Sequence, residues 1–495
     1  MDKVKKNHQL MEATIEEVHE LMNQGDLTAR ELVEFYLKRI EAYDKQGPKI
    51  NSVIRINPRA PEIAEELDRK YKESGFMGPL HGIPVLLKDN VDTADMETTA
   101  GSLSLEGVIP REDAPITKKM KEAGAVIIAK VNLHEFAIWG ETVSSMLGQT
   151  INPYDLTRTP GGSSGGTGAS VAANFGMIGI GTDTINSVRS PASACSLAGF
   201  RPTIGLVSRT GIVPYSHTQD TAGPICRTVE DAVKLLDVIK GYDPEDSATA
   251  PLEKEIGSSL AGNLKRDGLK EKRIGVLRSL FGKEEIHSEV NERISEALET
   301  IRQEGGVVID LQEEIDADYL IKEVSVHLYE LKRELNGYLE ELGERSAVRS
   351  LAEIIASGRF HKGIEENLKN AQGLSTAGPE YKERLMKREE LRNQVAAMMK
   401  KHGLDAVLYP HQKRPVVKVG ESQVDRNGVI GSVTGFPSCV VPAGFTKPTE
   451  DALGGVPVGI EFLAKEWDEA TLIEVAYGFQ EATGFRKPPF SVPGL

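Results

Sequence analysis

A run of glycine and hydroxyl residues that leads straight into an apolar segment constrains the fold of this chain more than any other feature. Small, mostly apolar residues follow over 169–174, and the run itself is Gly161-Gly162-Ser163-Ser164-Gly165-Gly166-Thr167-Gly168. A solvated linker would not continue directly into an apolar helix. Because glycine has no Cβ atom, the run predicts a point where the backbone closely approaches another segment or a ligand.

A phosphate-binding loop is the alternative interpretation of the same run. The Lys-Ser or Lys-Thr pair that ends a Walker A loop is missing from it. No side chain would therefore reach the terminal phosphates and the magnesium ion. The run does not support nucleotide binding.

Short apolar runs alternate with helical patterns and glycine-rich turns on both sides of this point. Their lengths suit buried strands, and the alternation predicts an α/β fold in which a large mixed β-sheet lies between helical layers. The strand-like runs cover residues 83–87, 125–129, 177–180, 274–277, 307–311, 406–409, 438–441 and 457–463.

We expect a single domain over residues 11–490, with its core at 80–235 and a return of the sheet pattern at 403–490. The segment 317–402 between them is charged, helix-rich and poor in strand signals. We expect it to form an outer layer of the fold, and a helical cap over a site is the alternative. Near the N-terminus, Thr14 with Glu17 and Thr28 with Glu31 form two capping-box patterns, which predict two helix starts.

Charge and cysteine content limit the partners and the compartment of the protein. The net charge of −15 argues against binding to nucleic acid or to anionic membranes. No stretch approaches the roughly 20 consecutive apolar residues of a membrane span, and residues 1–25 lack the apolar core of a signal peptide. Cys195, Cys226 and Cys439 form neither a disulfide nor a zinc pattern, so a reducing cytoplasm is the expected location.

Two further segments carry residues with potential chemistry. Lys88 ends the apolar run within residues 82–90, a position where a lysine considered alone is usually just solvated. Ser187 lies in the segment 181–192, which contains no Gly-x-Ser-x-Gly elbow. An α/β-hydrolase triad is therefore not predicted.

Together with the glycine run, these segments resemble the amidase signature family, in its stand-alone amidase branch. The three motifs occur in the family's order, with 75 residues from Lys88 to Ser163 and 24 from Ser163 to Ser187. The resemblance extends over residues 27–489. It is strongest at 82–232 and returns near the C-terminus at 435–445 and 455–462.

The resemblance implies a Ser–Ser–Lys triad, with Ser187 as nucleophile, Ser163 as bridging serine after a cis bond from Gly162, and Lys88 as base. A serine hydroxyl needs a neighbouring base, and a lysine can serve when burial lowers its pKa. The implied reaction is hydrolysis of a small carboxylic amide, or a carbamate or anilide, to an acid and ammonia or an amine. It runs through an acyl-enzyme and needs no metal or organic cofactor.

The sequence departs from the family beside the proposed nucleophile. The N–H groups of Thr184, Ile185, Asn186 and Ser187 would stabilise the oxyanion, but the family usually has two glycines where Ile185 and Asn186 stand. Because a β-branched residue is a severe outlier at positive φ, we expect Ile185 to keep negative φ and Asn186 to take any left-handed position. The added bulk is expected to narrow the pocket.

The substrate pocket is predicted from the family segment that helps to line the acyl site and from the residues that flank the two serines. As isolated apolar residues, those of the first segment are also typical of an ordinary core, which is the alternative. The predicted pocket residues are Trp139, Met146, Leu147, Gly161, Gly162 and Ile185.

We assign structural roles to the other polar or reactive residues near these motifs. His134 lies in a stretch that resembles a structural segment of the family, so a histidine relay is not favoured. Cys195 is expected to be a core thiol, and Asp183 and Arg189 are expected to be structural charges. Gln149 and Asn152 are expected to brace the backbone of the glycine run.

Two other functions stay open. The amidase subunit of a tRNA-dependent amidotransferase uses the same triad to release ammonia for a partner, but such subunits keep a Gly-Gly-Ser form where this chain has Ile185-Asn186-Ser187. An inactive binding or scaffold protein is the second alternative. The expected partner is a small-molecule amide substrate, and a homodimer follows from the resemblance alone.

Overall fold

The computed structural model describes residues 9–254 and 259–495. Residues 1–8, which belong to the segment predicted to lack a signal peptide, lie outside the described residues, as do 255–258. None of the helices in the described part of the chain combines the length and apolarity that crossing a membrane requires.

All eight predicted strand-like runs form strands at or within a few residues of the expected positions. The strands of the described residues are β1 (Val53–Ile56), β2 (Pro84–Lys88), β3 (Val126–Val131), β4 (Val143–Ser144), β5 (Gly148–Gln149), β6 (Ile178–Asp183), β7 (Ala198–Arg201), β8 (Thr221–Cys226), β9 (Arg273–Leu277), β10 (Val307–Leu311), β11 (Ala406–Pro410), β12 (Ser438–Phe445) and β13 (Pro457–Leu463).

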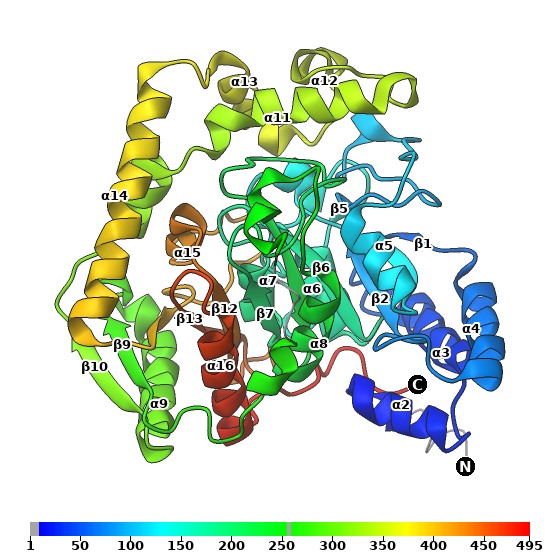
Figure 1. Cartoon of the computed structure of the whole chain (residues 1–495), viewed down its shortest axis with the longest axis horizontal. Coiled ribbons are helices and arrows are strands. Elements are labelled where there is room, and N and C mark those ends of the chain that lie inside the picture. Colours follow the sequence, from blue (N-terminus) through cyan, green and yellow to red (C-terminus); the bar gives the residue numbers. More distant parts are fainter. Residues whose placement is uncertain (1–8, 255–258) are drawn as a thin grey trace.

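These strands build one large sheet at the centre of the molecule (Figure 1). Within the described residues it has 11 strands in the order β1-β3-β2-β6-β8-β7-β12-β13-β11-β9-β10, and β4 and β5 form a separate hairpin. Strand β2 runs parallel to β3 and β6, and β9 runs parallel to β10 and β11. The other neighbours are antiparallel, which confirms the predicted mixed sheet.

The sheet is packed against helices, and several of them contact its central strands directly. The α-helices of the described residues are α2 (Ile15–Asn23), α3 (Ala29–Ile40), α4 (Ala60–Ser74), α5 (Pro115–Glu122), α6 (Gly165–Ala172), α7 (Arg189–Ala194), α8 (Val229–Ile239), α9 (Ser288–Gln303), α10 (Ala317–Tyr319), α11 (His327–Leu342), α12 (Leu351–Ser357), α13 (Glu365–Gly373), α14 (Pro379–His402), α15 (Val429–Thr434) and α16 (Glu469–Thr483).

Both predicted capping boxes are present at the starts of α2 and α3. The Thr14 hydroxyl accepts a hydrogen bond from the N–H of Glu17 at 3.2 Å, and the Glu17 carboxylate accepts one from the N–H of Thr14 at 2.9 Å. Thr28 and Glu31 form the same reciprocal pair. Each box satisfies main-chain donors that the first helical turn leaves without partners.

The glycine run lies where three segments cross at the centre of the fold. A Cβ atom on Gly166 would lie 2.1 Å from the carbonyl oxygen of Asn132, at the end of β3. Gly161 has φ +71, and a Cβ atom there would lie 2.9 Å from the carbonyl of Ser190 in α7. The predicted close approach is therefore to other parts of the chain, and it allows α6 and α7 to meet.

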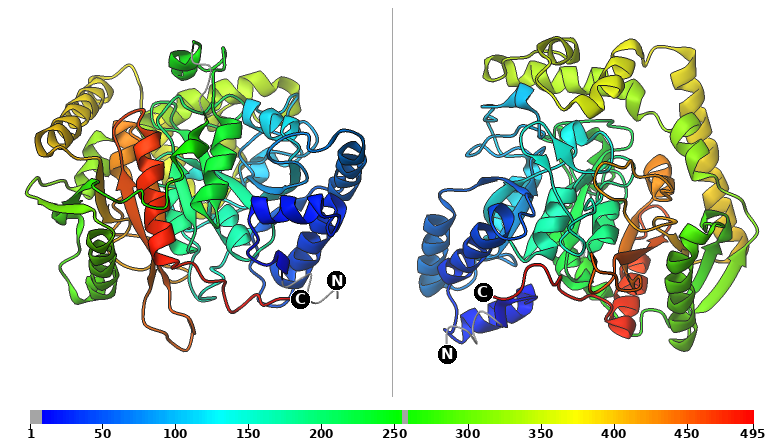
Figure 2. Two further views of the ribbon diagram at one scale, coloured as in Figure 1. Left: turned by 60° about the horizontal axis from the view of Figure 1, so that its bottom comes forward. Right: turned by 180° about the vertical axis from the view of Figure 1, so that it is seen from behind.

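The helix-rich segment lies across one end of the sheet. Figure 1 and the right-hand view of Figure 2 both show α11, α12 and α13 at this end and α14 running down one side. Buried apolar side chains of α11 to α13 share a core with the loops around Leu105, Phe136 and Val213. The prediction of an outer layer is wrong for α11 and for the π-helical turn Leu320–Val324, because residues of both line the cavity described below.

Candidate active site

Lys88 ends β2 and is completely buried. Burial lowers the pKa of Lys88 to about 7, although Asp183 and Asp220 act to raise it. Near neutral pH, a large fraction of the molecules therefore carry Lys88 as the neutral amine, and this amine can accept a proton. Lys88 Nζ lies 2.9 Å from Ser163 Oγ and 2.8 Å from Thr182 Oγ1.

Ser163 occupies the turn between the glycines and α6, with no exposed surface. The Gly162–Ser163 peptide bond is cis. The carbonyl of Ser163 accepts hydrogen bonds from the N–H of His134 at 2.9 Å and from Thr142 Oγ1 at 3.4 Å. These contacts hold the main chain of Ser163 while its hydroxyl faces Lys88.

Ser187 lies in the turn after β6. The N–H of Ser164 donates to the carbonyl of Ser187 at 3.2 Å, which brings the glycine run beside this turn. Ser187 lines a cavity, and neither Ser163 nor Lys88 does. Within the described residues, no hydrogen bond joins Ser187 Oγ to Ser163 Oγ, so the Lys88–Ser163 contact is formed and the Ser163–Ser187 contact is not.

The main chain around Ser187 presents a series of free donors. Thr184, Ile185, Asn186 and Ser187 all line the cavity. None of their N–H groups donates to an acceptor among the residues that the structure describes. Neither Ile185 nor Asn186 has positive φ, as expected for Ile185, and the turn needs no left-handed residue at Asn186.

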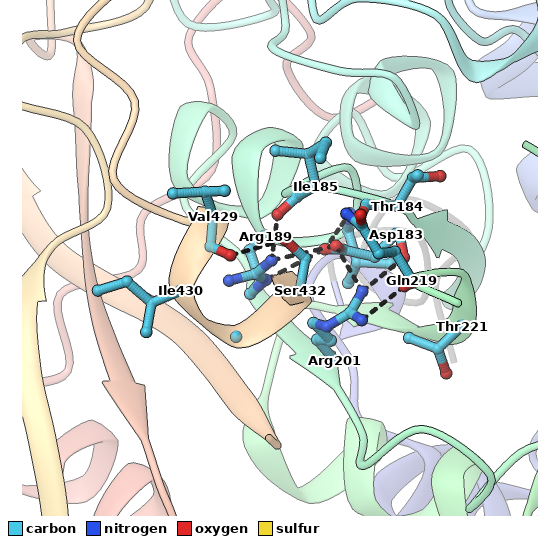
Figure 3. A network of polar contacts seen from close by, with 12 residues as sticks. Asp183, Thr184, Ile185, Arg189, Arg201, Gln219, Thr221, Val429, Ile430 and Ser432 are labelled. Atoms are coloured by element: carbon cyan, nitrogen blue, oxygen red, sulfur yellow. Dashed lines mark hydrogen bonds and ion pairs between the residues drawn. The ribbon is translucent and has the colours of Figure 1, made fainter. Parts of the chain in front are cut away.

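A buried charge network supports this turn from behind (Figure 3). Arg189 donates to both carboxylate oxygens of Asp183 and to the carbonyl of Ile185, and Arg201 donates to Asp183 at 2.9 Å. Arg189 also pairs with Glu461 of β13. Although burial acts to raise it, the two guanidinium groups hold the pKa of Asp183 well below its usual range. Asp183 and Arg189 are thus structural charges outside the cavity lining.

The cavity in front of Ser187 has a volume of about 320 Å³. It is enclosed by the turn after β6, the loop before β4, the helical segment and the loop before α15. Its lining residues are Ala137, Trp139, Thr184, Ile185, Asn186, Ser187, Tyr215, Ile321, Lys322, Ser325, His327, Leu328, Tyr329, Asn367, Arg384 and Arg426.

Two of the predicted pocket residues, Trp139 and Ile185, line this cavity. Trp139 lies in a loop where Phe136, Ala137 and Thr142 also have positive φ, and its indole donates to Asn367 of α13 at 2.9 Å.

The other four predicted pocket residues do not line the cavity. Met146 and Leu147 lie in the turn between β4 and β5, where the N–H of Met146 donates to Gly101 and the N–H of Leu147 to Ser144. Gly161 and Gly162 lie against neighbouring chain, because a Cβ atom on Gly162 would be 2.8 Å from Gly140 and one on Gly161 would meet Ser190.

The remaining polar residues near the motifs have structural contacts. His134 Nδ1 accepts from the N–H of Glu141 at 3.1 Å and does not reach the two serines. Cys195 is buried, and burial raises the pKa of its thiol, so it is a core thiol. Asn152 donates to the carbonyls of Thr159 and Ala194.

Gln149 donates to the carbonyls of Glu141 and Thr142. It thereby braces the segment whose Thr142 hydroxyl donates to Gly161 and accepts from the N–H of Gly165. Gln149 therefore supports the glycine run through Thr142.

Sequence reasoning missed most of the cavity wall and one contact of Lys88. Thr182, whose Oγ1 accepts a hydrogen bond from Lys88 Nζ, lies inside a strand pattern that gave no signal of its own. Tyr215, His327, Asn367 and Arg426 come from segments that only the tertiary fold brings together. In the described part of the chain, no group of three or more His, Cys, Asp or Glu side chains is arranged to hold a metal ion.

A family profile described as "Amidase" matches residues 31–473. The chain belongs to the amidase family. This amidase is 38% identical to a "probable amidase" of Arabidopsis thaliana, over 97% of its own length and 92% of the relative. It is 32% identical to a glutamyl-tRNA(Gln) amidotransferase subunit of Thermoanaerobacter pseudethanolicus, over 98% of this chain and 99% of the relative.

Among solved structures, the native peptide amidase of Stenotrophomonas maltophilia has a TM-score of 0.88 against this amidase, with 35% identity over 97% of this chain and 99% of that one. The family match and these neighbours confirm the predicted family and fold. They support an amide-hydrolysing enzyme that acts on C–N bonds.

Proposed function

We propose that this amidase hydrolyses a small carboxylic amide through an acyl-enzyme on Ser187, with Ser163 and Lys88 as its proton relay. The supporting observation is Lys88, with a pKa of about 7 and its Nζ 2.9 Å from Ser163 Oγ, behind a cavity that Ser187 lines. A buried neutral amine in contact with a serine is the kind of base that a weak hydroxyl nucleophile requires.

The acylation step moves two protons in one direction. Ser187 passes its proton to Ser163 Oγ, Ser163 passes its own to the Lys88 amine, and Ser187 Oγ bonds to the amide carbon. The free N–H groups of residues 184–187 are the donors for the developing oxyanion. Loss of one such donor costs roughly 3 kcal/mol of transition-state stabilisation.

The second half of the reaction reverses the relay. The C–N bond breaks, and the Lys88 ammonium returns a proton through Ser163 to the departing nitrogen, which leaves as ammonia or an amine. Water then attacks the ester on Ser187 with the same relay as base, and the carboxylic acid is released. The Ser163–Ser187 hydrogen bond belongs to the substrate complex, since catalytic hydrogen bonds are often long without substrate and tighten when it binds.

An amidase subunit of a tRNA-dependent amidotransferase is the second candidate, and it is favoured by the 32% identity over 98% of the chain to one protein of that kind. The higher identity to the Arabidopsis protein and the TM-score of 0.88 against a peptide amidase support the stand-alone enzyme. We also propose a cytoplasmic location, to which the three buried free thiols, Cys195, Cys226 and Cys439, are suited.

The experiment is release of ammonia or amine from a panel of aliphatic amides, aryl amides, anilides and carbamates, without ATP or a partner protein. Wild type is run beside Ser187→Ala and a control, Ser74→Ala, which removes an exposed hydroxyl at the end of α4. Hydrolysis by wild type and the control alone supports the proposal. Equal rates in Ser187→Ala would refute the nucleophile.

If wild type hydrolysed no amide of the panel, this result would contradict the stand-alone enzyme. Glutaminase activity that appears only with a co-purified partner would then support the amidotransferase function. Failure of Ser187 to react with a fluorophosphonate probe as well would support an inactive scaffold, the remaining alternative.

A further inference from the structure

The cavity in front of Ser187 carries positive charge in an acidic protein. The chain has a net charge of −15, yet Lys322, Arg384 and Arg426 line this cavity and no Asp or Glu is among its lining residues. A cavity lined by one sign of charge concentrates ligands of the other sign. The cavity is therefore suited to an anion.

The Arg384 guanidinium already donates to main-chain carbonyls of the protein. Its Nη1 donates to the carbonyl of Ser325 at 3.0 Å and its Nη2 to that of Lys322 at 2.5 Å. It also lies over the ring of Tyr329. These contacts connect α14 to the turn before α11, so Arg384 stabilises the wall of the cavity. Lys322 is exposed, so solvent screens its charge and weakens its interaction with a bound anion.

Arg426 is different, because its guanidinium has no acceptor. It is half-buried, just before α15, and lies 5.6 Å from the centre of the Trp139 ring. In residues 9–254 and 259–495, no hydrogen bond or ion pair of its side chain is formed. Five donors are thus held beside an aromatic face at the edge of the cavity.

Two carboxylates influence Arg426 without pairing with it. Glu141 and Asp318 act on it electrostatically, but neither forms an ion pair with it among the described residues and neither lines the cavity. The Glu141 carboxylate accepts hydrogen bonds from the N–H of Gln423 at 2.8 Å and from the N–H of Gly140 at 3.2 Å. A partly buried charge without a partner is costly, and a bound anion would relieve that cost.

His327 adds no charge to this wall of the cavity. Burial, together with the positive charges of Arg426 and Arg384, lowers the pKa of His327 to about 3. The imidazole is therefore neutral at physiological pH, with Nδ1 2.6 Å from Ser325 Oγ. The cations of this wall face an uncharged lining.

We propose that Arg426 determines specificity by binding a carboxylate on the acyl portion of the substrate, so that the preferred substrates are monoamides of dicarboxylic acids. The planar guanidinium matches a carboxylate with two parallel hydrogen bonds. The Trp139 ring lies beside the guanidinium, with its centre 5.6 Å from Arg426 Cζ. This inference rests on the proposed function, because it names the substrate class of the same site.

The test compares each charged amide with an uncharged amide of the same shape. Succinamate is paired with isocaproamide, in which an isopropyl group replaces the carboxylate, and glutaramate is paired in the same way. Wild type is expected to prefer the charged member in kcat/KM. In Arg426→Gln the preference should fall by about tenfold to hundredfold, the value of a hydrogen bond to a charged group, while the uncharged member changes by less than about threefold.

The matched control is Arg278→Gln. Arg278 also lies over an aromatic ring, 4.8 Å from the centre of Phe281, but it is exposed and outside the cavity lining. This variant loses the same charge and should keep the wild-type preference. An equal loss for both members of each pair in Arg426→Gln would mean that Arg426 only supports Trp139, and it would overturn the proposal.

A binding measurement separates this inference from the proposed function. The chain has two tryptophans, so Trp467→Phe leaves Trp139 as the only fluorophore of this kind. In Ser187→Ala with Trp467→Phe, glutarate should change Trp139 fluorescence saturably, glutaramide should not, and Arg426→Gln should abolish the change.

The outcomes of the two measurements are distinguishable. Glutarate binding through Arg426 without any amide hydrolysis would contradict the proposed function and leave the anion site intact. Hydrolysis with a preference for uncharged amides, and no effect of glutarate on Trp139, would support the function and overturn the anion site.

Discussion

Arg189 Nη2 donates a hydrogen bond to the main-chain carbonyl of Ile185 at 2.7 Å. The carbonyl and the N–H of a trans peptide unit point in opposite directions, so the N–H of Asn186 points away from Arg189. Arg189 is buried behind the turn, and Asn186 lines the cavity. A buried guanidinium thus fixes the direction of a main-chain donor beside Ser187.

The first prediction concerns this guanidinium. Arg189→Met removes the guanidinium that pairs with the buried carboxylates of Asp183 and Glu461. Asp183 keeps only Arg201 and Glu461 keeps only its contact with His411 among their ion-pair partners in the described residues, so the free energy of unfolding should fall by about 3–5 kcal/mol. Arg189→Lys keeps the charge but loses the fork that reaches Ile185, and it should lower kcat more than it lowers stability. Urea unfolding and amine release measure the two effects. A wild-type kcat in Arg189→Lys would contradict the orienting role.

The second prediction is the pH dependence of hydrolysis. The base must be the neutral amine, and the pKa of Lys88 is lowered to about 7 by burial. We therefore expect kcat/KM to rise as the pH increases through about 7 and then to level off. Lys88→Arg cannot lose its proton and should be slower by about two to four orders of magnitude at every pH.

This profile has a simple contrary outcome. A rate that is flat across neutral pH, or that rises only near the ordinary pKa of lysine, would show that Lys88 is not the base. Circular dichroism of Lys88→Arg at the same pH values checks that the variant is folded.

The third prediction concerns the contact between α11 and the core, where Tyr338 donates to Asp92 at 2.9 Å. Burial raises the pKa of Asp92 to about 7, although Lys130 acts to lower it. The folded protein therefore holds a proton that the unfolded chain releases near 3.8. The stabilisation from this proton is complete below that pH and is lost as the pH rises through about 7.

Asp92→Asn removes this titration while keeping an acceptor for Tyr338. The loss of thermal stability of wild type between about pH 5 and about pH 8 should be smaller in Asp92→Asn. Asp95→Asn, in the same loop and paired with Lys121 near the surface, should behave as wild type. Identical pH dependence of Tm in all three proteins would contradict the assignment to Asp92.

The fourth prediction concerns Ile185, which is partly buried and lines the cavity. Ile185→Ala should widen the space beside Ser187, so kcat/KM for amides with branched acyl groups should rise relative to acetamide. The lost contacts should cost about 1–2 kcal/mol of stability, less than for a fully buried residue. Ile321→Ala on another wall of the cavity serves as control, and an unchanged acyl preference in Ile185→Ala would contradict the narrowing.

The elements that the sequence predicted are those set by local chemistry. The reciprocal bonds of Thr14 and Glu17 involve residues three apart, and the apolar run before Lys88 suffices to indicate a buried strand. The family resemblance, carried by the order and spacing of Lys88, Ser163 and Ser187, implied that the three residues would gather at one place, and the structure brings Lys88 and Ser163 into contact.

The cavity could not be predicted in the same way, because its wall depends on contacts between distant segments. Tyr215, His327 and Arg426 carry no shared spacing, and they meet at the cavity only through the tertiary fold. The resemblance to a family segment that helps to line the acyl site predicts Met146 and Leu147 in the pocket, whereas both lie in the turn between β4 and β5, outside the cavity lining.

The pairing of β7 with β12 has a consequence for synthesis of the chain. Strand β7 ends at Arg201, and its partner begins at Ser438. At roughly 5–20 residues per second, the partner leaves the ribosome on the order of tens of seconds later. Strands β1 to β8 can pair during this interval, but β7 keeps an open edge that invites association between chains. The nascent protein is therefore most vulnerable to aggregation until translation reaches β12.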